Sequence, residues 1–72
     1  MKTELEKKLD KLPDEIMYEN TSFSLEITKI NVRKESNWFI NYIDKADNSL
    51  IFVAHQSLQA AVDTTLKEIK NL

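Results

Sequence analysis

The chain has 72 residues and a formal net charge of −2, and it contains neither cysteine nor glycine. A chain of this length forms one domain, expected over residues 1–72, whose core is small because only about 60% of the unfolded surface can be buried. The missing cysteines exclude disulfides and thiolate metal clusters. The missing glycines exclude phosphate-binding loops, dinucleotide fingerprints and nucleophile elbows.

Charge and hydropathy predict a soluble, cytoplasmic protein. No apolar run approaches the roughly 18 residues of a membrane span, and residues 1–12 are charged throughout, unlike a signal peptide. A negative net charge is the wrong sign for general binding to nucleic acid or anionic membranes. Small domains without disulfides often depend on a partner, so we expect a homodimer or a complex with another protein.

A short helix is predicted over residues 3–12. Thr3 and Glu6 form a capping box, and Leu5, Leu9 and Leu12 share one helical face. Pro13 ends the helix, because the residue before a proline is pushed out of the helical region.

Residues 13–19 allow two interpretations. Pro13 could open a further helical turn that runs to about Glu19. Residues 16–27 look more like a hairpin, with a turn at Asn20 and an alternating strand from Phe23 to Ile27.

The alternation then changes phase, because Ile30 and Val32 have the other parity. A β-bulge near Thr28 and Lys29 would return both sets to one face. Fraying of the strand end explains the pattern equally well.

Two more strands are predicted, over residues 38–43 and 50–55, with a polar connector at 33–37 and a turn-rich loop at 44–49. Residues 50–55 are apolar on both parities, which is typical of a central strand or of one with a partner on its second face. Without glycine, turns that need a positive φ must use Asn or Asp. The candidates are Asn20, Asn37, Asp47 and Asn48.

The last element is a helix from Leu58 to Leu72 with Ser57 as N-cap. Five residues of its apolar stripe are expected to be buried against the sheet: Leu58, Ala61, Val62, Leu66 and Ile69. The stripe comprises Leu58, Ala61, Val62, Thr65, Leu66, Ile69 and Leu72. The predicted fold is α+β and two-layered: an antiparallel meander of three or four strands, with an N-terminal and a C-terminal helix on one side.

No catalytic, cofactor-binding or metal-binding residue is predicted, and we expect a protein that is not an enzyme. His55 is the only histidine, so a triad would have to use it; we expect it to bond the adjoining loop or face solvent. The carboxylate groups Asp14–Glu15 and Asp44/Asp47 would need a pocket to separate their pKa values. Roles at helix ends and turns account for them.

Three aromatic residues, Trp38, Phe39 and Tyr42, could form a base-stacking platform on an open sheet. We favour Trp38 and Tyr42 in the core and Phe39 on a dimer face. If Trp38 and Phe52 face the helices, residues of the other parity need a second cover, which a symmetric dimer through a sheet face or edge would supply. These residues are Phe39, Ile43, Ile51 and Val53.

Two families share this order of elements. From Phe23 onward, three strands followed by Ser57-Leu58-Gln59-Ala60-Ala61 resemble the partially degraded RNase H-like domain of HicB-type antitoxins. The whole order is similar to the double-stranded RNA-binding domain. The basic helix start of the RNA-binding family and the glycine-containing turns of the HicB type are absent, so neither function is carried over.

A Trp-x-x-x-Tyr strand (Trp38 to Tyr42) before a terminal helix is also similar to short uncharacterised phage and mobile-element proteins. The expected function is a small non-catalytic protein-interaction module, of phage or mobile-element type. The alternative is a nucleic-acid-binding or antitoxin-like regulatory protein, for which Lys29, Arg33, Lys34 and Lys45 would supply the cations. Glu26, Glu35 and Asp44 interrupt them.

Overall fold

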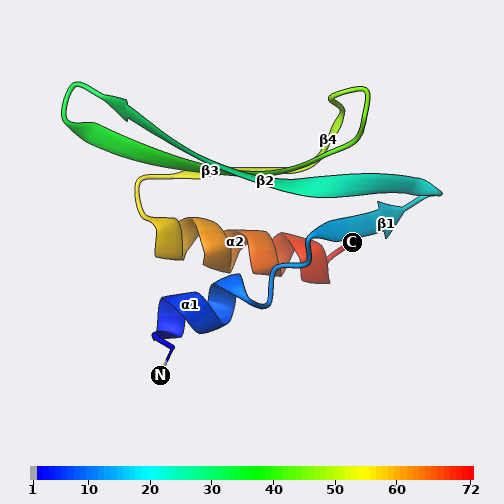
Figure 1. Ribbon diagram of the computed structural model, residues 1–72, viewed down its shortest axis with the longest axis horizontal. Coiled ribbons are helices and arrows are strands. Elements are labelled where there is room, and N and C mark those ends of the chain that lie inside the picture. Colours follow the sequence, from blue (N-terminus) through cyan, green and yellow to red (C-terminus); the bar gives the residue numbers. More distant parts are fainter. Residues whose placement is uncertain (1) are drawn as a thin grey trace.

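The computed structural model describes residues 2–72 and has two layers, a four-stranded antiparallel sheet and two helices on one of its faces (Figure 1). Each strand pairs with its neighbours in the sequence, so the order of the strands in the sheet is their order in the chain. This confirms the α+β prediction, with four strands. The elements are α1 (Glu4–Leu9), β1 (Glu15–Tyr18), β2 (Thr21–Val32), β3 (Glu35–Ile43), β4 (Ser49–His55) and α2 (Leu58–Lys70).

Helix α1 begins with the predicted capping box. The Glu6 N–H donates to Thr3 Oγ1 at 3.2 Å, and the Thr3 N–H donates to Glu6 Oε1 at 3.4 Å. The helix ends at Leu9, three residues earlier than predicted, and a turn places Leu12 in the core. Strand β1 follows Pro13 at once, so the hairpin interpretation of this region is correct and the helical one is wrong.

Two hairpins turn tightly without glycine. Glu19 and Asn20 join β1 to β2, Arg33 and Lys34 join β2 to β3, and all four residues have positive φ, between 48° and 70°. Two successive residues of positive φ in a two-residue loop are the signature of a type I′ turn. The predicted polar connector at residues 33–37 is therefore too long.

Of the four predicted turn residues, two adopt positive φ. Asn20 and Asp47 do so, whereas Asn37 lies within β3. Asn48 instead donates hydrogen bonds to the side chain of Asp44.

Strand β2 pairs with β3 without interruption from Ser24 to Val32. The predicted bulge at Thr28 and Lys29 is therefore wrong, and the irregularity in the sheet lies between Tyr42 and Ile43, where β3 meets β4. Because the register is continuous, the apolar residues of β2 change face along the strand.

The core lies between the sheet and the helices. Ile40 and Tyr42 of β3 are fully buried there, opposite Ala61 and Val62 of α2. The remaining buried apolar residues are Leu12, Phe23, Ile51 and Val53. We call this side of the sheet the inner face.

Helix α2 starts at the predicted cap, since the Ala60 N–H donates to Ser57 Oγ at 3.4 Å. The buried part of its stripe is narrower than predicted. Ala61, Val62 and Thr65 are buried, and the Thr65 hydroxyl donates to the Ala61 carbonyl at 2.7 Å. Leu58, Leu66 and Ile69 are partly buried, while Leu72 lies beyond the helix and is half exposed.

The predicted orientation of β4, with Phe52 facing the helices and Ile51 and Val53 facing away, is the reverse of the observed one. Val53 pairs with Ile40 and Ile51 pairs with Tyr42, so both lie on the inner face and are buried. Phe52 points to the opposite side. Strand β4 is an edge strand, so the first of the two alternatives for residues 50–55, a central strand, is wrong, while the second, a partner on the other face, stays a prediction.

Candidate functional site

One face of the sheet has no helix of residues 2–72 over it, and we call it the outer face. Figure 1 shows that the β2–β3 and β3–β4 hairpin ends both bend away from the helices, so the sheet curls toward this side. The strand pairings assign to it Ser24, Glu26, Thr28, Ile30 and Val32 of β2, Asn37, Phe39, Asn41 and Ile43 of β3, and Phe52 and Ala54 of β4.

The middle of the outer face carries a pair of aromatic rings. Phe39 and Phe52 stack with their ring centroids 5.9 Å apart and an angle of 27° between the planes. They are diagonal neighbours on β3 and β4, because Phe39 pairs with Ala54 and Phe52 with Asn41. Phe52 remains 60% exposed, which makes it a large apolar side chain directed at solvent.

A polar group lies beside these rings. The Oδ1 atom of Asn41 is buried and has no hydrogen-bond partner within residues 2–72. Nearly all buried polar atoms in folded proteins have such a partner. Asn41 therefore adds an unsatisfied hydrogen-bonding group to an otherwise apolar patch.

The backbone directions in the sheet follow from one hydrogen bond. The Leu25 N–H donates to the Asp14 carbonyl at 2.9 Å, so Leu25 directs its backbone groups toward β1. Its partner across the next ladder is Tyr42. In an antiparallel sheet such a pair shares no hydrogen bonds, so Tyr42 directs its backbone groups toward β4.

The open edge of β4 is fixed by the same alternation. Tyr42 pairs with Ile51, so Ile51 and Val53 bond to β3. Phe52 and Ala54 then direct their N–H and C=O groups away from the sheet. Nothing in residues 2–72 pairs with this edge, because β4 has β3 as its only neighbour.

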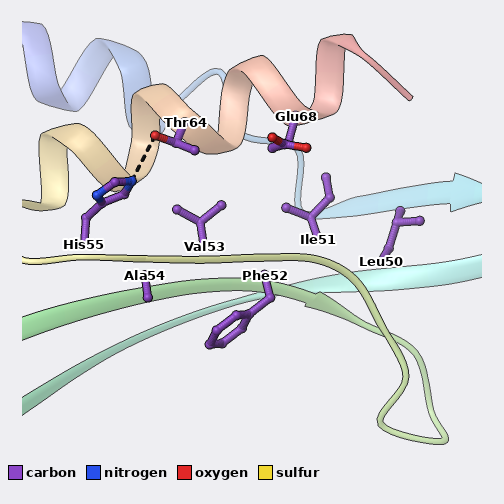
Figure 2. A pocket seen from close by; sticks show the side chains of 8 residues that line it. All are labelled: Leu50, Ile51, Phe52, Val53, Ala54, His55, Thr64 and Glu68. Carbon is purple, nitrogen blue, oxygen red and sulfur yellow. Dashed lines mark hydrogen bonds between the residues drawn. The ribbon is translucent and has the colours of Figure 1, made fainter.

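A shallow groove of about 320 Å³ runs along this edge, between β4 and the flank of α2. Residues 50–55 form one wall, and Thr64 and Glu68 of α2 form the other. Figure 2 shows His55 at one end of the groove, beneath Thr64, and Glu68 further along, above the stretch between Val53 and Ile51. The groove thus has an imidazole toward one end and a carboxylate toward the other.

His55 holds the end of β4 against α2. Its Nε2 atom lies 3.1 Å from the Thr64 hydroxyl oxygen, and the ring is half buried. We predicted a bond to the adjoining loop or exposure to solvent, and the partner is instead a helix residue. This contact gives His55 a structural role.

The carboxylate groups are separate and serve turns and strands. Asp44 Oδ1 accepts from the N–H groups of Ala46 and Asn48 at 2.8 and 2.9 Å. These bonds, that of Asn48 foremost, lower the pKa of Asp44. Glu15 accepts from the Ser22 hydroxyl at 2.8 Å. Within residues 2–72 no three histidine or carboxylate side chains are grouped so that they could hold a metal ion.

The three aromatic residues singled out in the sequence lie on different faces. Tyr42 is buried and Trp38 is half buried on the inner face, where the Lys29 ammonium lies 5.3 Å from the indole centroid. Phe39 is on the outer face. The predicted face of its stacking partner Phe52 is wrong, because the register between β4 and β3 determines that face and the sequence of β4 alone does not.

No family model, curated protein or solved structure matches the chain. Neither helix in residues 2–72 is long and apolar enough to cross a membrane.

Proposed function

We propose that this chain is a small, non-catalytic protein-interaction module that binds a partner protein with its outer face. The observation that carries the proposal is the stacked pair Phe39–Phe52, of which Phe52 is 60% exposed. Aromatic side chains are enriched in the buried centre of protein interfaces and dominate their energetics. They supply a large contact area at a low cost in conformational entropy.

The surroundings of the pair support this function. Thr28 and Asn41 place polar groups beside the rings, and Glu26 lies opposite Asn41 on β2. An apolar centre with a polar rim is the usual arrangement of an interface. The amide of Asn41 offers a hydrogen bond that a partner could complete.

The structural roles of two titratable side chains also fit a protein that binds a partner without catalysis. His55 is engaged with Thr64, and Asp44 organises its own turn. Each of these groups has a structural partner that accounts for its position.

The test is a comparison of partner binding by three forms of the tagged chain in extracts of its source cells. Phe39→Ser removes one ring of the stack, and Leu72→Ser removes an exposed apolar side chain beyond the end of α2. We expect a protein retained by the wild type and by Leu72→Ser to be lost with Phe39→Ser. Equal retention by both variants would contradict the proposal.

A second candidate is nucleic-acid binding in a regulatory, antitoxin-like setting. It is favoured by the cations Lys29, Arg33 and Lys34, which gather at the exposed end of the β2–β3 hairpin. Two carboxylates, Glu26 and Glu35, lie on the same hairpin. The salt dependence of oligonucleotide binding separates the two functions, because phosphate contacts weaken steeply with salt.

A further inference from the structure

From Ile51 to His55, beyond the irregularity beside Leu50, the edge of β4 lacks the features that keep exposed strands apart. Edge strands of natural proteins usually carry lysine, proline, inward-pointing charges or a covering loop. Residues 49–55 read Ser-Leu-Ile-Phe-Val-Ala-His and have no lysine, proline or carboxylate. An exposed apolar strand of this kind readily pairs with another chain, so it needs a defined cover.

The other open edge of the sheet is different. The part of β2 that follows its pairing with β1 is also unpaired on one side. It carries Lys29 and is followed by Arg33 and Lys34 in the turn. These charges protect that edge, so the two edges are not equivalent.

We propose that a second copy of this chain covers the edge, with the two β4 strands antiparallel and Val53 of each copy opposite Val53 of the other. In this register the outward backbone groups of Phe52 meet those of Ala54 in the second copy. Because the axis is two-fold, the same pair forms twice. Four backbone hydrogen bonds result, and each uses a donor or acceptor that β3 leaves free.

The side chains on the outer face fit this register. Phe52 lies opposite Ala54 of the second copy, so a large side chain neighbours a small one on both sides of the axis. A register centred on Phe52 would leave more of the outward N–H and C=O groups of β4 without a partner. Beyond the central pair, its hydrogen bonds would have to join Ala54 of one copy to Leu50 of the other. Leu50 lies beside the irregularity where β3 meets β4. The Val53 register is therefore the favoured one.

The polar side chains of the groove argue for a second copy as the occupant. The groove holds His55 toward one end and Glu68 further along (Figure 2). Antiparallel pairing about Val53 sets His55 of each copy opposite Ile51 of the other, on the side of the groove where Glu68 lies. Each carboxylate then faces the imidazole of the other copy.

The flank of α2 leaves room for a second helix. Thr64 lines the groove, and Ala60 lies one turn earlier on the same side of the helix. Both side chains are small. Two copies of α2 could therefore lie side by side beneath the joined sheet, which would have four strands from each copy.

This interface shares Phe52 with the partner-binding site proposed above but does not use Phe39. It would bring two Phe39–Phe52 pairs onto one continuous outer face. A chain that dimerises but binds no partner protein would reject the proposed function and leave the dimer proposal intact. A chain that binds a partner protein as a monomer would reject the dimer proposal and leave the proposed function intact.

The first measurement combines sedimentation of the purified chain over a range of concentrations with amide hydrogen exchange. We expect a monomer–dimer equilibrium. The amides of Phe52 and Ala54 should gain protection as the dimer forms, while those of Ile51 and Val53 are protected throughout by β3. A strict monomer at high micromolar concentration, or protection of Phe52 and Ala54 that does not change with concentration, would overturn the proposal.

The second measurement uses a matched pair of proline variants. Ala54→Pro removes an N–H that points out of the sheet, so the fold is kept while two of the four intermolecular bonds are lost. The dimer dissociation constant should rise by about 30-fold at ~1 kcal/mol per bond. Lys29→Pro removes an outward N–H at the other edge and should leave dimerisation unchanged.

A third variant covers the case in which Ala54→Pro does not fold. Ala54→Lys leaves the backbone intact and places a charge opposite Phe52 of the second copy, so it should also yield monomers. Native circular dichroism with unchanged dimerisation in Ala54→Lys would contradict the proposed register.

Discussion

The hydroxyl of Tyr42 donates a hydrogen bond of 2.8 Å to the backbone carbonyl of Pro13. This bond ties the centre of β3 to the segment between α1 and β1. Burial of the ring, together with the nearby charge of Asp14, raises the pKa of Tyr42 to about 12. The link persists as long as the phenol stays protonated.

Tyr42→Phe should destabilise the domain by about 1–2 kcal/mol, because it removes the bond and leaves the Pro13 carbonyl without its partner. Urea unfolding measures the difference. Tyr18→Phe is the control, since Tyr18 is on the surface at the end of β1 and its hydroxyl has no comparable bond to any of residues 2–72. Equal effects of the two changes would show that the Tyr42 bond contributes nothing specific.

The same residue predicts a loss of stability at alkaline pH. The folded pKa of Tyr42, about 12, lies above the unfolded value of about 10. Between these values the unfolded chain has released the proton and the folded chain still holds it, so stability falls as pH rises. The contribution is complete below about pH 10. Urea titrations of wild type and Tyr42→Phe should converge across this range, because the wild type is the more stable at neutral pH and declines more steeply.

Val62→Ala should cost about 2 kcal/mol, the loss of two buried methyl-sized groups together with a small cavity. Val62 is fully buried between α2 and the sheet. Leu72→Ala removes more apolar surface from a half-exposed position and should change thermal unfolding little. A larger effect at Leu72 than at Val62 would contradict the observed packing of α2.

The glycine-free turns predict a stabilising substitution. Lys34 has φ of 70°, a region that costs most residues about 1 kcal/mol or more and costs glycine almost nothing. Lys34→Gly should therefore stabilise the domain by about 1 kcal/mol, read from the urea midpoint. Lys29→Gly, inside β2, should destabilise it by a similar amount. If both glycines destabilise, the Arg33–Lys34 turn is not type I′.

The protein should not bind nucleic acid tightly at physiological salt. Lys29 lies against the indole of Trp38, and Arg33 and Lys34 are offset by carboxylates on the same hairpin. Binding of random duplex and single-stranded oligonucleotides at ~150 mM salt is the measurement. Submicromolar affinity that declines steeply with added salt would replace the protein-interaction proposal with the nucleic-acid one.

Local signals in the sequence identified the elements that depend on neighbouring residues. The capping box at Thr3 and Glu6, the stop at Pro13 and the cap at Ser57 each involve contacts within one turn of chain. The order of elements, and hence the fold, followed from these and from the strand alternation. The extent of β2 and β3 did not, because nothing in the composition of Arg33 and Lys34 favours a two-residue turn.

The outer face could be foreseen only in part. Phe39 lies on the face away from the core, as predicted, because Ile40 and Tyr42 fix the buried parity of β3; that this face forms a dimer stays a prediction. Residues 50–53 are apolar on both parities, so their own pattern does not decide which face is buried. The pairing of Val53 with Ile40 decides it, and that is a contact between strands that no single strand reveals.

The attachment of α1 to the rest of the molecule has a consequence for its motions. None of its residues is fully buried; Leu5 and Leu9 pack only partly, and the Lys8 ammonium lies 2.9 Å from a partly exposed Asp63 carboxylate on α2. Exposed ion pairs of this kind contribute less than about 1 kcal/mol. We therefore expect helix α1 to be the first element to open in the native ensemble, while the sheet and α2 stay closed. Its opening would expose the flank of α2 that carries Asp63.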